Sequence, residues 1–89
     1  MKLDWTRGAE ADMDRIWHFL AGRSVDLADR IEAAIRIGVT RLPAFPLIGR
    51  LRADAGRELV LPDIQYRIGY FVQDGRILIA SVRSTKEGA

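Results

Sequence analysis

The sequence predicts a single α+β domain, residues 1–89, in which an antiparallel two-helix hairpin packs on one face of an antiparallel β-sheet, in the order β-α-α-β-β-β. Apolar residues recur every three or four positions over residues 9–20 and 27–42, which is typical of two amphipathic helices. The second half contains short segments of alternating polarity separated by turn residues, which indicates strands. At 89 residues the chain is long enough for one domain and too short for two.

The first 42 residues contain the predicted first strand and both helices. Residues 3–5 alternate in polarity, which suits a short strand. Thr6 is the expected N-cap of the first helix and Gly22 its left-handed C-cap. Ser24 is the expected N-cap of the second helix, which should end near Leu42 because a proline follows it. The turn between the helices is so short that they should form an antiparallel hairpin.

The second half of the chain is predicted to form a loop and three strands. Residues 43–56 contain two prolines and two glycines, which predicts an irregular connection. A loop of this length in a small domain is often functional, although it could simply join the helices to the sheet. The strands are expected at residues 57–61, 65–72 and 76–83. Asp74-Gly75 is a strong hairpin signal, and the small polar residues 84–89 predict a flexible tail.

The charge of the chain is modest and uneven. Fourteen basic and twelve acidic residues give a net charge of +2, which is a weak signature of nucleic-acid binding. Residues 41–89 hold eight basic and five acidic groups, so the surplus lies in the predicted sheet, as a functional basic face or as ordinary scatter. The absence of cysteine excludes disulfides and agrees with a cytoplasmic location. The apolar runs of the chain are too short for a membrane span, so no membrane partner is expected.

No catalytic residue, metal site or cofactor is expected. His18 is the only histidine and has no second ligand nearby, which predicts a surface or boundary position. Asp12 and Asp14 diverge on a helix, so stabilisation of the helix N-terminus explains them better than an acid–base pair. The sequence also contains no phosphate-binding loop and no nucleophile elbow.

Alternation along residues 65–72 predicts the face of the sheet that is open to partners. Tyr66, Ile68, Tyr70 and Val72 should face the helices, so Arg67 and Phe71 should point the other way. Arg57 and Arg83 share that open face if the strand registers agree. The candidate contacts to a macromolecular target are Arg67, Phe71 and Arg83, supported by Arg50, Arg57 and Lys86. Alternatively, Arg57 pairs with a carboxylate and Arg50 only braces the long loop.

Several segments, in this order and spacing, resemble the RelE/ParE toxin superfamily of type II toxin–antitoxin systems, and ParE-like toxins most closely. The ParE-like pattern is L-x-x-x-P-x-x-G-R, then R-E-L-V, then Y-R-I-x-Y, then a hydrophobic last strand. The matching segments are residues 42–50, 57–60, 66–70 and 77–82. Asp12, Met13 and Ile16 also resemble the D-L-x-x-I segment of the first helix, so the resemblance covers about residues 3–83.

The resemblance implies a helical hairpin on an antiparallel sheet, a cognate antitoxin partner and growth arrest by binding of DNA gyrase. The alternatives are a RelE-like ribosome-dependent mRNA endonuclease and an antitoxin-binding module without toxicity. The chain departs from both patterns at its end. ParE-like chains commonly place a histidine two residues after the last-strand valine, whereas Val82 is followed by Arg83 and Ser84. RelE-like nucleases use a C-terminal aromatic residue, whereas no aromatic residue follows Phe71. Direct contact with nucleic acid is left open.

Overall fold

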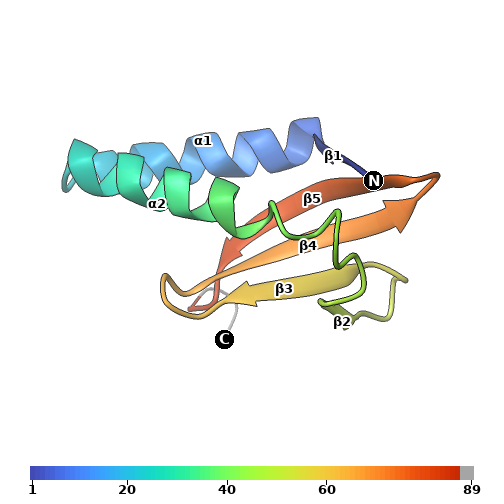
Figure 1. Ribbon diagram of the computed structural model, residues 1–89. Coiled ribbons are helices and arrows are strands. Elements are labelled where there is room, and N and C mark those ends of the chain that lie inside the picture. Colours follow the sequence, from blue (N-terminus) through green and yellow to red (C-terminus); the bar gives the residue numbers. More distant parts are fainter. Residues whose placement is uncertain (87–89) are drawn as a thin grey trace.

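The computed structural model describes residues 1–86 and shows a helical layer on a sheet (Figure 1). The elements are β1 (Lys2–Trp5), α1 (Arg7–Ala21), α2 (Val25–Gly38), β2 (Arg50–Leu51), β3 (Arg57–Leu61), β4 (Tyr66–Gln73) and β5 (Arg76–Ser84). The predicted order and the α+β class are confirmed. One strand is additional, because the short β2 lies inside the stretch predicted as loop.

The sheet has five strands in the order β1-β5-β4-β3-β2. Both helices lie side by side over one of its faces (Figure 1). Strands β2 to β5 pair antiparallel, but β1 pairs parallel with β5, so the prediction of a purely antiparallel sheet is wrong at this edge. The register shows why β1 pairs here. Leu3 lies beside Ile77 and Trp5 beside Ile79, so apolar side chains of both strands lie on the helical face.

The helix N-caps are those predicted, and the helix ends differ. The hydroxyls of Thr6 and Ser24 accept from backbone N–H groups three residues ahead, each at 3.1 Å. Gly22 has φ −60° and ψ −23°, so the predicted left-handed cap is wrong. The chain instead turns through a hydrogen bond from the N–H of Ser24 to Leu20. The second helix ends at Gly38 rather than near Leu42, because Leu42 already bonds three residues back, to Val39.

The core lies between the helices and the sheet. Its buried members come from both layers and from the segment after α2: Ala9, Met13, Ile16, Ile35, Val39, Leu42, Leu59, Ile68, Tyr70, Ile77, Ile79 and Val82. Ile68 and Tyr70 are fully buried, and Tyr66 and Val72 pack beside them, as alternation predicts. The prediction that these four side chains of β4 face the helices is therefore confirmed.

The C-terminal strand extends one residue beyond its predicted end. β5 includes Ser84, and the N–H of Thr85 donates to the carbonyl of Gln65 at 2.9 Å. Ser84 thus lies opposite Tyr66 of β4, and Thr85 is tied to the β3–β4 connection, in place of the flexible tail predicted from residue 84. Lys86 donates its N–H to the hydroxyl of Ser84 at 3.1 Å, and residues 87–89 of the predicted tail lie outside the described residues.

Candidate functional site

The strand registers place three predicted contact residues on the outer face of the sheet, away from the helices. Arg67 lies directly opposite Arg83, and Phe71 lies opposite Leu78. Directly opposed residues of an antiparallel pair project to the same face. Since Ile68 and Tyr70 point inward, Arg67, Phe71 and Arg83 share the outer face. We call this surface the open face.

Arg50 also belongs to the open face. It lies opposite Glu58 in the β2–β3 pair, and Glu58 lies opposite Gly69 in the β3–β4 pair. Because opposed residues share a face, Arg50 projects to the same side of the sheet as Gly69 and Arg67. Arg50 is exposed, so its guanidinium extends the basic character of this face to the edge strand.

Arg52 is a fifth member of the open face that the sequence analysis did not select. A Cβ atom on Gly69 would lie 2.7 Å from Nη1 of Arg52 and 2.4 Å from the hydroxyl of Ser81, so both groups occupy the space above this glycine. Asp54 forms an ion pair with Arg52, and this hydrogen bond lowers the pKa of the Asp54 carboxyl and raises the pKa of Arg52. The available signal was Gly69 itself, because a glycine within a strand often marks a close approach of another group.

Arg57 does not lie on the open face. It is directly opposite Tyr70 and therefore on the helical side of the sheet. Its Nη1 donates to the carbonyls of Gly49 at 2.8 Å and Leu47 at 3.3 Å. The expectation that Arg57 shares a face with Arg67 is wrong, because the β3–β4 register places it opposite an inward residue. The acceptors of both hydrogen bonds are loop carbonyls rather than the carboxylate considered as an alternative.

A second clamp on the same loop comes from Tyr70. Its buried hydroxyl donates to the carbonyl of Pro46 at 2.9 Å and accepts from the N–H of Gly49 at 2.8 Å. These residues belong to three of the separate sequence motifs described above. Pro46 and Gly49 lie in residues 42–50, Arg57 in residues 57–60 and Tyr70 in residues 66–70. The three motifs therefore converge on one hydrogen-bonded cluster, which fixes the backbone of residues 45–49.

The fixed loop presents apolar side chains to solvent. Phe45 and Leu47 are each 63% exposed and Ile48 is 48% exposed. With Pro46, they line one almost entirely apolar surface hollow. Exposed apolar patches mark interaction sites when they gather in this way. The long loop thus has the features of a docking surface as well as joining the helices to the sheet.

Asp12 controls the end of β5 that carries Arg83. The register between β4 and β5 shifts after Gly69, so Ala80 is an extra residue that forms a β-bulge. Asp12 on α1 accepts a hydrogen bond from the N–H of Val82 at 2.9 Å, next to this bulge. If the strand ran through Ala80 without a bulge, strict alternation from Ile79 would turn Arg83 toward the helices. Asp12 thus helps to hold the bulge that places Arg83, in addition to the role at the helix N-terminus predicted for it.

Lys86 lies apart from the arginines of the open face. It lines a groove together with Phe19 of α1 and the inward-facing Tyr66. This groove belongs to the helical side of the sheet, since Tyr66 packs against the core. Of the six predicted contact residues, the structure brings together Arg50, Arg67, Phe71 and Arg83.

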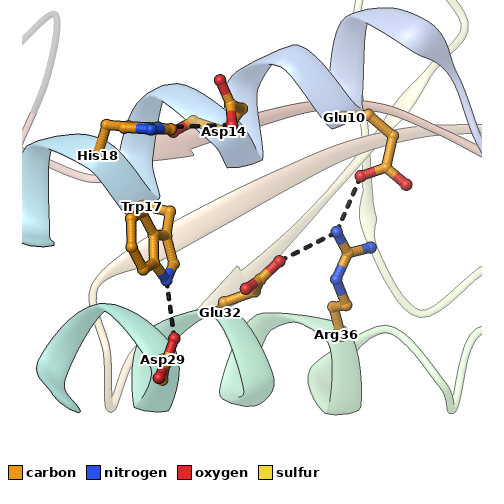
Figure 2. A network of polar contacts seen from close by, with 7 residues as sticks. All are labelled: Glu10, Asp14, Trp17, His18, Asp29, Glu32 and Arg36. Atoms are coloured by element: carbon orange, nitrogen blue, oxygen red, sulfur yellow. Dashed lines mark hydrogen bonds and ion pairs between the residues drawn. The ribbon is translucent and has the colours of Figure 1, made fainter. Parts of the chain in front are cut away.

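Polar contacts on the helical hairpin join α1 to α2 (Figure 2). Arg36 donates to Glu10 across the hairpin at 2.8 Å and to Glu32 on its own helix at 3.3 Å. Its guanidinium carbon also lies 4.6 Å from the ring centroid of Trp5, which adds a cation–π contact. The hydrogen bond to Glu10 is the main cause of the raised pKa of Arg36. These contacts link α1 to α2 and Arg36 to β1.

The histidine on α1 is part of the same surface. The side chain of His18 is 68% exposed, which confirms its predicted surface position. Its Nδ1 lies 2.9 Å from the carbonyl oxygen of Asp14 and 3.4 Å from the Asp14 carboxylate (Figure 2), a partner that the sequence analysis overlooked. Within residues 1–86, no three potential ligand side chains gather where they could hold a metal ion.

Comparison with known proteins connects this geometry to a family. The family model for the ParE toxin of the type II toxin–antitoxin system parDE matches residues 3–88. The chain belongs to the ParE toxin family. A solved chain of the chromosomal ParDE TA system from P. aeruginosa shares its fold, with a TM-score of 0.84, 27% sequence identity and coverage of 97% of both chains. A search of curated proteins gave no match.

The fold brings together three motifs that lie far apart in the sequence. In this ParE-family chain they meet at the loop clamp of Pro46, Gly49, Arg57 and Tyr70. The predicted resemblance, closer to ParE than to RelE, is confirmed. Within the described part of the chain, no helix is both long and apolar enough to cross a membrane.

Proposed function

We propose that this ParE-family chain is an active cytoplasmic toxin that arrests growth by binding DNA gyrase and is neutralised by a cognate antitoxin. The observation that carries the proposal is the pairing of Arg67 with Arg83 on the open face. Both guanidinium groups lie on one face of the sheet, and arginine forms paired hydrogen bonds with carboxylate or phosphate groups of a partner. Arg50 and Arg52 add to the same positive surface. Arginine stays charged near neutral pH, which suits binding better than proton transfer.

An antitoxin fits two features of the surface. The family is one of toxin–antitoxin pairs, and the apolar loop of Phe45, Leu47 and Ile48 lies near the exposed Arg50. A partner that covers both needs apolar and acidic residues together. An amphipathic acidic segment has this composition, and such segments bind grooves and sheet edges in many complexes.

Antitoxin binding is expected to raise the melting temperature of the purified chain. A partner at ten times its Kd adds about 1.4 kcal/mol to the apparent stability if it binds only the folded form. The measurement is a thermal melt with increasing amounts of the protein encoded next to this chain. A melting temperature that does not change with added partner would contradict the antitoxin part of the proposal.

Removing three open-face side chains is expected to abolish toxicity. The triple variant Arg67→Ala, Phe71→Ala, Arg83→Ala should restore growth and weaken inhibition of purified gyrase at least tenfold in a supercoiling assay. Arg23→Ala with Arg30→Ala is the matched control, since both arginines are exposed and lie on the helical layer. Urea unfolding of each variant separates lost binding from lost folding. Full toxicity of a folded triple variant would refute the role of the open face.

The same preparation distinguishes gyrase inhibition from RNA cleavage. The chain is added to translating ribosomes with a defined message, and the message is expected to stay intact. Reproducible cleavage in the ribosomal A site, lost in Lys86→Ala, would replace gyrase inhibition with the RelE-like nuclease activity. Lys86 is the informative variant because lysine can transfer a proton more readily than arginine.

A further inference from the structure

Three guanidinium groups and one hydroxyl gather on two adjacent rows of the open face. One row pairs Gly69 with Ser81, and the next pairs Arg67 with Arg83. Successive residues on one face of a strand are two positions apart, or about 7 Å. Arg52 reaches the first row from the segment after β2, because its Nη1 occupies the space above Gly69 beside the hydroxyl of Ser81.

The position of Arg52 is fixed before any partner binds. Asp54 forms an ion pair with Nη2 of Arg52 and also accepts from the N–H of Gly56 at 2.9 Å. The N–H of Arg52 itself donates to the carbonyl of Gly56 at 2.7 Å, which closes the turn. One carboxylate thus holds both the guanidinium and the turn that carries it, and Nη1 is directed over Gly69.

We propose that Arg52, Ser81, Arg67 and Arg83 form a binding site for phosphate groups of a nucleic-acid backbone. Guanidinium groups bind phosphate through paired hydrogen bonds, and serine hydroxyls are common phosphate donors. A phosphodiester extends along a chain, so consecutive phosphates can occupy the two rows. The proposal rests on the proposed function only in the source of the phosphate, which is the DNA held by gyrase.

The site keeps a surplus of arginines over carboxylates, and the neighbouring aromatic ring favours nucleic acid over an acidic protein surface. Glu58 lies opposite Gly69 on the same face and Asp54 holds Arg52, so two carboxylates lie close to the site. Arg50 lies opposite Glu58 and offsets its charge. Phe71 lies two residues beyond Gly69 on the same face and is half-buried. Cationic side chains beside an aromatic ring are typical of surfaces that bind single strands by phosphate contact and base stacking.

The decisive variant is Gly69→Ala, which changes no charge. Its Cβ would displace Nη1 of Arg52 and the hydroxyl of Ser81, both of which are ends of movable side chains, so the fold should survive. Binding is measured by fluorescence anisotropy with a labelled single-stranded DNA dodecamer over a series of salt concentrations. The Kd of Gly69→Ala should rise at least fivefold. Arg83→Ala should also lower the slope of log K against log salt by about 0.7 for each phosphate that the variant no longer binds.

Two control variants and one competitor decide between the outcomes. Gly8→Ala adds the same methyl group where the nearest atom is 3.7 Å away, and Arg23→Ala removes the same charge from the exposed turn between α1 and α2. Both should bind the dodecamer like the unaltered chain, and all melting temperatures are compared. Unchanged affinity in Gly69→Ala, an equal reduction of affinity in Arg23→Ala, or stronger competition by polyglutamate than by unlabelled DNA would each overturn the site. Unaltered chain that binds DNA but leaves gyrase unaffected would instead refute the proposed target.

Discussion

Gly49→Ala is expected to lower the free energy of unfolding by about 3 kcal/mol, through overpacking and the loss of two hydrogen bonds. The added Cβ would lie 2.6 Å from the hydroxyl oxygen of Tyr70, 2.7 Å from a carbon of its ring and 2.9 Å from the carbonyl oxygen of Glu58. The ring is fully buried and the carbonyl belongs to β3, so neither can move aside at low cost. Relief requires movement of the loop backbone, which would separate Gly49 and Pro46 from the Tyr70 hydroxyl.

Urea unfolding followed by tryptophan fluorescence measures this loss. Gly22→Ala is the matched control, because Gly22 has ordinary helical φ and ψ angles and its nearest contact for a Cβ is 3.4 Å, to the carbonyl of Phe19. That variant should change stability by less than about 0.5 kcal/mol. Tyr70→Phe keeps the ring and removes only the hydroxyl, so it should lose about half as much as Gly49→Ala. Stability of Gly49→Ala equal to that of the unaltered chain would show that the loop is not held as described.

Asp12→Ala is expected to cost about 2 kcal/mol because it leaves the N–H of Val82 without its charged acceptor. Hydrogen bonds to charged groups are stronger than neutral ones, and the Asp12 side chain is only 19% exposed. The loss should be local as well as global. Hydrogen exchange of the Val82 amide should accelerate more than that of amides elsewhere in the β4–β5 ladder.

Asp14→Ala provides the comparison on the same helix. Its carboxylate is 75% exposed, so its removal should change stability by less than about 0.5 kcal/mol. If Asp12→Ala and Asp14→Ala have the same small effect, Asp12 serves only the helix N-terminus, as the sequence suggested. Slow exchange at Val82 in Asp12→Ala would also contradict its assignment as the residue that holds the bulge.

The parts of the fold that the sequence predicts are those decided by neighbouring residues. Thr6 and Ser24 cap helices whose first N–H groups lie three residues ahead. Asp74 and Gly75 both adopt positive φ, of 52° and 72°, as a tight hairpin turn requires. Residues distant in sequence decide the rest. β1 takes its direction from β5, and β2 pairs with β3 through only two residues, which is too short a stretch to give a periodic signal.

In the candidate site too, residues placed by local patterns could be predicted and residues placed by distant contacts could not. Arg67 could be placed because alternation within β4 is regular on both sides of it. Alternation alone would turn Arg83 inward from Ile79, and only the bulge held by Asp12 brings it to the open face. Arg52 could not be placed, since an ion pair with Asp54 in an irregular turn decides where its guanidinium lies. A local pattern gives the face of a strand and leaves out contacts made across the fold.

The parallel pairing of β1 with β5 affects when the chain can finish folding during synthesis. The register joins Lys2 to Arg76 and Trp5 to Ile79, so the strand made first waits for the strand made last. Until β5 has emerged from the ribosomal exit tunnel, β1 lacks its partner and β4 lacks one of its neighbours. Arg83 also belongs to β5, so a nascent chain cannot present the complete open face. The fold therefore delays assembly of its binding surface until β5 has left the exit tunnel.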